Sequence, residues 1–438
     1  MQDMTATDSS KDARDTHLVA GPATDRPVAH RPWYMLLLLA LIYIFGSIDR
    51  AVPSVIVEPL KSEFGLSDSQ MGFLTGFAYS IPFAMAALPA GWLIDRMDRR
   101  ILLSISSAIW SLLTAVGAFA QNFTMLVLAR VGVGASEAPA SPGSLSIISD
   151  LFPKERRATA ISLYYAGTAT GQMITFLVGG WLLLHFGWRT LFMIAAVPGL
   201  ILAALLFFTC KEPRRGQYDD ERGASEPVSY SKAVGVIFRT PALRHAIVAN
   251  MLVTGVQYAV MVWTVSLLVR VHAMSVEYAA MAMGVAVGLV MMIGSTLVGF
   301  VADSYAKGDP ARIATVPAIG AVFAGLAGVA MCLMTSLVPA LIFMAILAFC
   351  MGVNTGPSYT TLVSMTSSNM RGSILSVAKI ASILIGNGFL AYYTGAVSDL
   401  IGGEDSIRWA LLLTVIFFFW ASLHFCLASR AWRSRLAD

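Results

Sequence analysis

Long apolar runs, separated by short polar stretches, dominate the pattern of this 438-residue chain. Twelve runs can be marked out, and each is roughly 20 residues long, which lets a helix cross about 30 Å of hydrocarbon. The predicted spans cover residues 33–57, 71–94, 101–120, 123–148, 158–185, 191–210, 243–269, 279–302, 313–335, 338–359, 374–397 and 410–427. The pattern predicts an all-α, multi-pass membrane protein.

The spans fall into two sets of six, divided by a charged stretch at 211–242. The segments GWLIDRMDRR (91–100) and GFVADSYAKG (299–308) take matching places in the two sets, which indicates repeated halves around a central site. We expect two pseudo-symmetric six-helix bundles. The expected parts are a disordered cytoplasmic tail (1–31), an N-terminal bundle (32–210), a cytoplasmic linker (211–242), a C-terminal bundle (243–429) and a short cytoplasmic tail (430–438).

Composition supports this assignment, since 57% of the residues are hydrophobic and 13% are charged, against about 25% charged in soluble proteins. A net charge of +4 gives no reason to expect a nucleic-acid partner. The four cysteines lie in apolar runs without paired spacing, so neither a disulfide framework nor a metal site is expected.

Basic residues between the spans predict the orientation, because they concentrate on the cytoplasmic side. One side carries Arg96, Arg99, Arg100, Lys154, Arg156, Arg157, Lys211, Arg214, Arg215, Arg222, Lys232, Arg239, Lys307, Arg312, Arg371, Arg430, Arg433 and Arg435. The other side carries Lys61, Arg189, Arg270 and Arg408. Both termini are therefore expected in the cytoplasm, with the chain in a bacterial inner (plasma) membrane.

Few ionisable residues lie deep inside a span, and such residues are costly and functional candidates. The deep acids are Asp49 and Glu137, and the bases inside spans are Arg50, Arg130 and Lys379. Lys379 lies only about two turns into its span, so it can also snorkel to the surface.

Helix rise tests whether these groups can meet. Asp49 lies about 24 Å into the first span, while Arg130 and Glu137 lie about 10 and 21 Å into the oppositely directed fourth span. Arg130 can therefore pair with Asp49, and Glu137 comes within reach of Arg50 or a substrate. We predict proton coupling at Asp49 and Glu137, and substrate contacts at Arg50, Arg130 and Glu137. The alternative is that these charges only fix the first span against the fourth.

Other polar positions fall where helices are interrupted. Glycine and proline punctuate the fourth span in RVGVGASEAPASPG and the tenth in MGVNTGPSYT, as is tolerated where a segment lines a cavity. Asn354 and Tyr359 on the tenth span, with Gln257 and Tyr258 on the seventh, are candidate substrate contacts. Helix–helix packing is the alternative role for each of them.

The segment 91–100 predicts a cytoplasmic gate. Gly91 permits close helix approach, and Asp95 can pair with a basic group or cap a neighbouring helix end. Together with Arg96, Arg99 and Arg100 it forms an ionic latch in this prediction, one that breaks when the cytoplasmic side opens. The alternative is that the three arginines only mark the topology.

GWLIDRMDRR resembles the signature between the second and third helices of the major facilitator superfamily, with Asp98 where a glycine is usual. SIDR (47–50), ARVGVGASEAPASP (129–142) and SDLFPKERRATAISLYYAGTATG (149–171) resemble the spinster-like lipid transporters. FPKERRA also occurs in organic-anion symporters of the superfamily. The spinster resemblance implies that Asp49, Arg50, Arg130 and Glu137 serve coupling and substrate binding.

The same resemblance implies transport of a lysophospholipid or a sphingoid phosphate. A proton-coupled symporter of a soluble organic anion, such as a sugar acid, is the alternative. A membrane-embedded enzyme is disfavoured because the six histidines lack HExxH or any paired spacing, and no P-loop supports a primary pump. We expect protons, an amphipathic anion and membrane lipids as partners, no cofactor, and a monomer.

Overall fold

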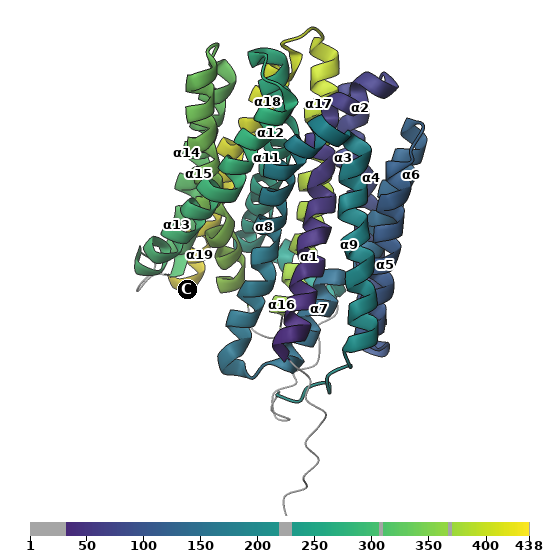
Figure 1. Cartoon of the computed structure of the whole chain (residues 1–438). Helices are drawn as coiled ribbons and strands as arrows, with labels where there is room; N and C mark the ends of the chain where they lie inside the picture. The colour runs from purple at the N-terminus through teal and green to yellow at the C-terminus, as the bar shows by residue number, and fades with distance from the viewer. Residues whose placement is uncertain (1–31, 219–229, 306–309, 367–369, 438) are drawn as a thin grey trace, which may run out of the picture.

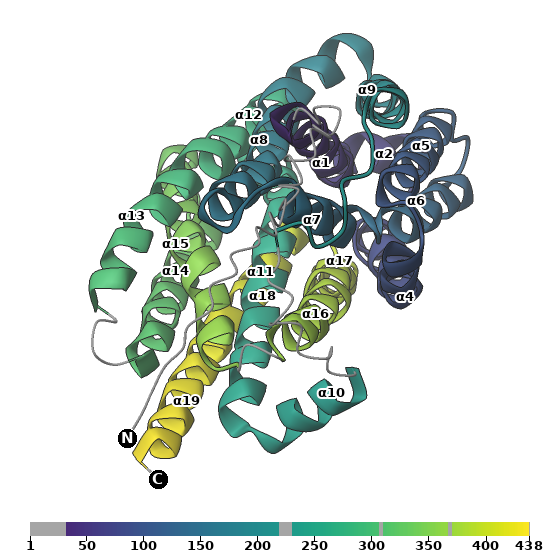
Figure 2. The ribbon, with the colours of Figure 1, turned by 90° about the horizontal axis from the view of Figure 1, so that it is seen from below.

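The computed structural model describes residues 32–218, 230–305, 310–366 and 370–437. The predicted tail at 1–31, most of the centre of the predicted linker and the last residue of the predicted C-terminal tail lie outside the described residues. Within the described residues the chain is helical and has no strand. Seen from the end where the linker runs, the helices gather into two groups (Figure 2).

The N-terminal group, here called the N-half, supplies the first six spans. Its helices are α1 (Pro32–Val55), α2 (Val57–Phe64), α3 (Asp68–Thr75), α4 (Phe77–Arg96), α5 (Arg99–Ala118), α6 (Phe123–Glu137), α7 (Ala140–Leu151), α8 (Lys154–Phe186) and α9 (Trp188–Thr209). The second span is built from α3 and α4, and α6 with α7 builds the fourth.

The C-terminal group, here called the C-half, supplies the other six spans after the linker helix α10 (Tyr230–Arg239). Its helices are α11 (Pro241–His272), α12 (Val276–Val285), η1 (Ala286–Val290), α13 (Met291–Tyr305), η2 (Pro310–Ala314), α14 (Thr315–Leu333), α15 (Leu337–Ser364), α16 (Arg371–Ala381), η3 (Ser382–Phe389), α17 (Leu390–Ile401), α18 (Ser406–Val415) and α19 (Phe417–Ala437). Among them, η1 and η3 are π-helical segments inside the eighth and eleventh spans.

Eleven helical stretches in the described residues are long and apolar enough to cross a membrane. The fourth span is absent from that set because α6 ends at Glu137 and α7 begins at Ala140, so that neither helix is long enough alone. Pro139 lies at this break, and Pro142 follows in the first turn of α7. A proline removes a backbone donor and clashes with the preceding turn, which places the deep acid Glu137 at a helix end.

Two ends of the molecule need names. The linker end is the end where α1 begins and the linker passes, at the bottom of Figure 1, and the opposite end is where α2 and α17 meet. At the opposite end α2 was not predicted from the sequence. Its Glu63 accepts hydrogen bonds from Arg189 and Trp188, which hold the pKa of this carboxyl below its usual range.

Glycines let the two halves approach closely toward the opposite end. A Cβ at Gly72 would lie 2.6 Å from the carbonyl oxygen of Ala391, and one at Gly76 would lie 2.5 Å from that of Gly388. Gly72 and Gly76 form the GxxxG spacing that permits backbone contact between membrane helices. The tight approach of α3 to η3 and α17 therefore depends on the missing side chains.

An ion cluster joins the halves at the same end. Arg270 on α11 contacts Glu58 and Asp68 of the N-half, at 2.7 Å in each case. Asp68 also pairs with Lys61 and accepts a hydrogen bond from Ser398 of α17. We call this set the opposite-end cluster. Its carboxylates come from the N-half and its bridging guanidinium comes from the C-half, so separation of the halves here must break it.

Candidate functional site

Two carboxylate–arginine pairs lie between α1 and α6, as helix rise predicted. The first, Asp49 with Arg130, is held at 2.9 Å and is enclosed: the two side chains are 0% and 4% exposed. Arg130 donates from both Nη atoms to the two carboxylate oxygens, and Thr114 of α5 donates to Oδ1 at 2.8 Å. The Phe192 ring lies 5.3 Å from the guanidinium carbon. We call this the enclosed pair.

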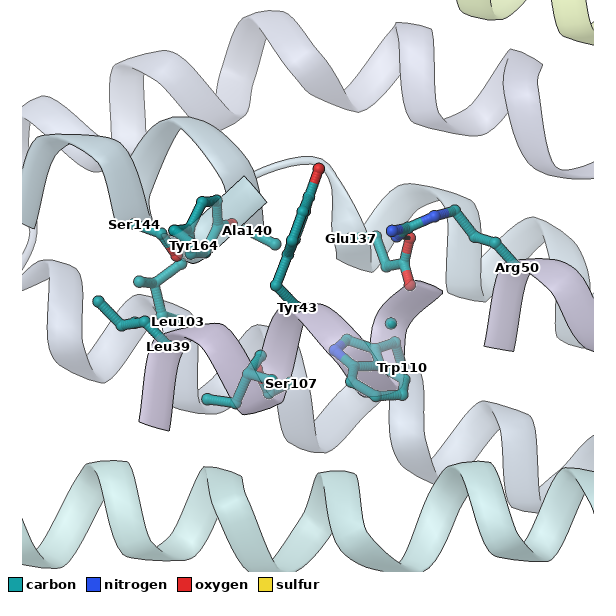
Figure 3. Close-up of a pocket in the computed structure, with 12 residues that line it drawn as sticks. Leu39, Tyr43, Arg50, Leu103, Ser107, Trp110, Glu137, Ala140, Ser144 and Tyr164 are labelled. Carbon is teal, nitrogen blue, oxygen red and sulfur yellow. Dashed lines mark hydrogen bonds and ion pairs between the residues drawn. The ribbon is translucent and has the colours of Figure 1, made fainter. Parts of the chain in front are cut away.

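The second pair joins Arg50 to Glu137 at 2.6 Å (Figure 3). The Glu137 side chain is 2% exposed, whereas that of Arg50 is 28% exposed, so Arg50 is the more open member of the pair. We call this the half-open pair. Because a charged group must be paired or hydrated to stay stable, Arg50 can exchange its carboxylate for another anion more readily than Arg130 can.

Tyr79 of α4 completes the half-open pair. Its hydroxyl donates to Glu137 Oε2 at 2.6 Å, and Arg50 Nη1 donates to the same oxygen at 2.6 Å. The other oxygen, Oε1, is buried without a hydrogen-bond partner in the described part of the chain. The two oxygens of Glu137 are thus inequivalent, which gives the carboxyl one occupied and one vacant acceptor.

Tyrosines surround this pair. The Tyr43 ring lies 5.7 Å from the Arg50 guanidinium carbon and stacks on Tyr164 with 4.4 Å between ring centroids. Tyr165 meets Tyr43 edge-on at 5.9 Å. Tyr359 of the C-half is 45% exposed and lies close enough to Tyr43 and Tyr165 to interact electrostatically with both.

The remaining predicted substrate residues are scattered. Tyr258 donates to the Thr75 carbonyl at 2.8 Å and so links the halves, and it is within electrostatic reach of both deep arginines. Gln257 donates to the Met351 carbonyl inside the C-half. Asn354 is fully buried against Gly320 of α14. Only Tyr258 and Tyr359 lie near the half-open pair, and a substrate role for all four stays a prediction.

The predicted gate residues separate into two kinds. Asp95 and Arg96 are exposed, with Arg96 over the Trp92 ring at 4.6 Å, and Gly91 has no neighbour that would meet a Cβ. Arg99 is instead buried and paired with Asp150 of α7 and Glu212 of the linker, at 2.6 and 2.5 Å. Arg100 donates through its backbone N–H to Glu212. The buried part of this set fastens the N-half to the linker.

Sequence reasoning missed Tyr79, Thr114 and Tyr43. A single hydroxyl or ring in an apolar span is normally a packing residue, and none of the three stands out by charge. The signal that could have found them is position, since Tyr79 and Thr114 lie on neighbouring helices beside the deep charges and Tyr43 lies about two turns before Arg50 on α1.

The profile of the Major Facilitator Superfamily matches residues 39–386. A solved bacterial homologue of the human lysosomal transporter spinster, in an inward-facing and unoccupied conformation, is 29% identical with a TM-score of 0.83, and the alignment covers 91% of this chain and 97% of that one. The superfamily and spinster-like resemblances predicted from sequence are thereby confirmed, and the family is one of transporters rather than enzymes.

The chain is also similar to curated proteins with different names. An MFS-type efflux pump of Mycolicibacterium smegmatis is 27% identical over 65% of this chain and 66% of its own. A probable L-galactonate transporter of Escherichia coli is 32% identical over 38% of this chain and 37% of its own. Protein spinster homolog 1 of Xenopus laevis is 28% identical over 59% and 48%. The chain thus spans less than two thirds of each of these relatives.

Proposed function

Since this chain belongs to the Major Facilitator Superfamily of membrane transporters, we propose that it is a proton-coupled carrier of an amphipathic anionic lipid, a lysophospholipid or sphingoid phosphate. The carrier works by alternating access between its two halves. The observation that carries the proposal is the half-open pair, in which a buried carboxylate is paired with a partly exposed arginine side chain.

In this mechanism the anionic headgroup binds Arg50 from the exposed side and replaces Glu137 as its counter-ion. Glu137, left in a dry site without its cation, then becomes neutral by taking up a proton, because an unpaired buried charge is costly. Anion binding and protonation are thus linked by charge balance. When Glu137 releases the proton, its ion pair with Arg50 re-forms and the anion is released.

The enclosed pair has a supporting role in the proposal. Arg130 donates to both carboxylate oxygens of Asp49, and Asp49 also accepts from Thr114, so a headgroup at Arg130 would have to displace two charge-assisted hydrogen bonds. Arg130 therefore positions α1, and a direct contact with the headgroup is assigned to Arg50. Proton coupling at Asp49 is retained as a prediction secondary to Glu137.

The lipid substrate is supported by the overall likeness to the spinster homologue and by the aromatic surroundings of Arg50. The Tyr43 ring lies beside the guanidinium, and Tyr165 and Tyr359 lie near Tyr43, which suits a headgroup with an adjoining apolar chain. In this proposal the linker end, which carries most of the basic residues, faces the cytoplasm. The ion pairs that join the halves at the opposite end are consistent with an inward-facing form, the state of the spinster homologue.

A sugar acid is the second candidate, favoured by the alignment with the probable L-galactonate transporter. A hydroxylated carboxylate would use the same guanidinium and the tyrosine hydroxyls. The two candidates predict different binding of an uncharged lipid: a lipid site would still bind it, whereas a sugar-acid site would not.

The test is binding to purified protein in nanodiscs, with a sphingoid phosphate and the matching uncharged sphingoid alcohol. Arg50→Gln is expected to weaken binding of the phosphate at least tenfold, about 1.4 kcal/mol. Binding of the uncharged alcohol is expected to weaken less than twofold. Arg189→Gln, at an exposed arginine of the opposite end, is the matched control. Equal losses for both ligands contradict the headgroup assignment, and uptake of galactonate without lipid binding transfers the proposal to the sugar acid.

A further inference from the structure

We propose that the linker helix α10 lies in the membrane interface and binds the phosphate headgroups of anionic bilayer lipids along its basic edge. The basic edge is the set Lys232 and Arg239 of α10 with Arg244 of α11. This lipid contact lies at the rim of the C-half, apart from the half-open pair, and it does not depend on which substrate is carried.

The position of α10 places it at the depth of the headgroups. It ends at Arg239, and α11 begins at Pro241, so one residue separates it from a membrane span. With 32 residues α11 is about 48 Å long, while a bilayer with its headgroup layers is about 40–45 Å thick. The start of α11 therefore reaches the headgroups and brings α10 to the same level. Figure 2 shows α10 at the rim of the C-half, beside α16.

One face of α10 is packed against the protein. Ala233 and Ile237 are 0% and 7% exposed, and they belong to a buried cluster with Leu243 of α11 and Ile374 of α16. These two α10 residues are four apart and so share a face of the helix. The cluster fixes how α10 is rotated, and so determines which of its side chains face outward.

A second face of α10 is apolar and exposed. The Phe238 side chain is 66% exposed and that of Val234 is 36% exposed, again four residues apart. At 3.6 residues per turn this face lies about 100° to one side of the packed face, and Lys232 with Arg239 lies about 130° to the other side. Separate apolar and basic sectors are typical of a helix that lies in the plane of the membrane interface.

The basic edge carries charge without a counter-ion in the described part of the chain. Lys232 and Arg239 are exposed and seven residues apart, so they share a face. Arg244 is exposed and donates from Nη1 to the Phe238 carbonyl at 3.0 Å, which brings its guanidinium to the last turn of α10. None of the three pairs with a described carboxylate, and residues 230–250 contain no Asp or Glu.

A bilayer surface satisfies both exposed faces at once. Hydrocarbon at the headgroup boundary takes up Phe238 and Val234, while lipid phosphates neutralise the basic edge. In the proposed orientation this rim meets the cytoplasmic leaflet, whose anionic lipids attract basic segments beside a membrane span. An acidic soluble protein would neutralise the charges but would leave the apolar face without hydrocarbon. The pairing of the two faces therefore favours lipid.

The first measurement is the depth of α10 in nanodiscs. Spin labels are attached at Phe238→Cys and, in a separate protein, at Lys232→Cys, both with Cys426→Ser because Cys426 is the exposed cysteine. Collision rates with oxygen, which concentrates in lipid, and with a water-soluble nickel chelate report the depth of each label. We expect oxygen collisions to dominate at position 238 and chelate collisions to dominate at position 232.

The second measurement is lipid retention, by native mass spectrometry of protein released from nanodiscs of equal phosphatidylglycerol and phosphatidylcholine. The double variant Lys232→Gln with Arg239→Gln is expected to retain at least threefold less phosphatidylglycerol, with phosphatidylcholine unchanged. The matched control is Lys211→Gln with Arg214→Gln, which removes one lysine and one arginine from exposed linker positions away from α10. The control is expected to match the parent.

Dominant chelate collisions at position 238 would overturn the interfacial placement and assign the exposed face to a soluble partner. Equal losses of phosphatidylglycerol in the two double variants would overturn the basic edge and leave only general attraction to net charge. Thermal unfolding verifies that each variant is folded. Neither measurement uses a transported substrate, so failure of the proposed function would leave both results standing.

Discussion

The enclosed pair and the half-open pair have the same chemistry, lie on the same two helices and differ in their surroundings. Asp49 and Arg130 satisfy each other, with Thr114 and Phe192 closing the set. In the other pair, one carboxylate oxygen of Glu137 has no partner and the Arg50 side chain is partly exposed. The contrast shows that two ion pairs on the same helices can differ in how completely their hydrogen-bond positions are filled, and our proposal assigns exchange to the less filled pair.

Breaking the enclosed pair is expected to have the largest effect. Asp49→Ala leaves Arg130 buried with no counter-ion, which costs about 3–5 kcal/mol. Glu137→Gln keeps the shape of the side chain at the half-open pair, and Arg50 can be hydrated there. We therefore expect a loss of stability of less than about 1 kcal/mol. Unfolding of both variants in the same detergent measures the difference. Equal destabilisation would mean that the two pairs are energetically alike.

Loss of the Tyr79 hydroxyl should have the next largest effect. Tyr79→Phe removes a hydrogen bond to a charged carboxylate, worth about 1.5–3 kcal/mol, and frees Oε2 to bind Arg50 alone. Tyr43→Phe is the matched control, because the Tyr43 hydroxyl makes no hydrogen bond to Glu137 in the described structure. The free energy of unfolding should change in Tyr79→Phe alone. If both variants behave like the parent, Tyr79 is only a packing residue.

The two pairs also show how far sequence reasoning reaches. The apolar runs predicted the twelve spans, and helix rise placed Arg130 beside Asp49 and Glu137 beside Arg50. The sequence did not predict which pair would be enclosed, because that depends on Thr114, Tyr79 and Phe192 from other helices. Their hydroxyls and rings carry no periodic or charged signal. Nor did it predict α2 and α10, since neither is long or apolar enough to stand out.

The opposite-end cluster offers a third kind of ion pair, one that joins the two halves. Arg270→Gln removes the guanidinium that bridges Glu58 and Asp68 across the halves. We expect the population that is open at the opposite end to rise roughly tenfold, about 1.4 kcal/mol. Electron–electron distances between spin labels on α2 and α18 measure this. Arg189→Gln, which breaks an ion pair within the N-half, should leave the distances unchanged.

Asp95→Asn is expected to have the smallest effect on stability and is the sharpest test of the predicted latch. Asp95 is exposed and makes no ion pair with a described residue, so its neutralisation should change the free energy of unfolding by less than about 0.5 kcal/mol. If Asp95 pairs with a basic group only when the linker end closes, the same change removes that pair from the closed form alone. The population open at the linker end should then rise, as measured between spin labels on α4 and α16. Arg99→Gln is expected to have the opposite effect on stability. It leaves Asp150 and Glu212 without their shared cation, so it should lower the free energy of unfolding in every state. A distance distribution unaltered by Asp95→Asn would leave Asp95 without a gating role and would assign Arg96 to topology alone.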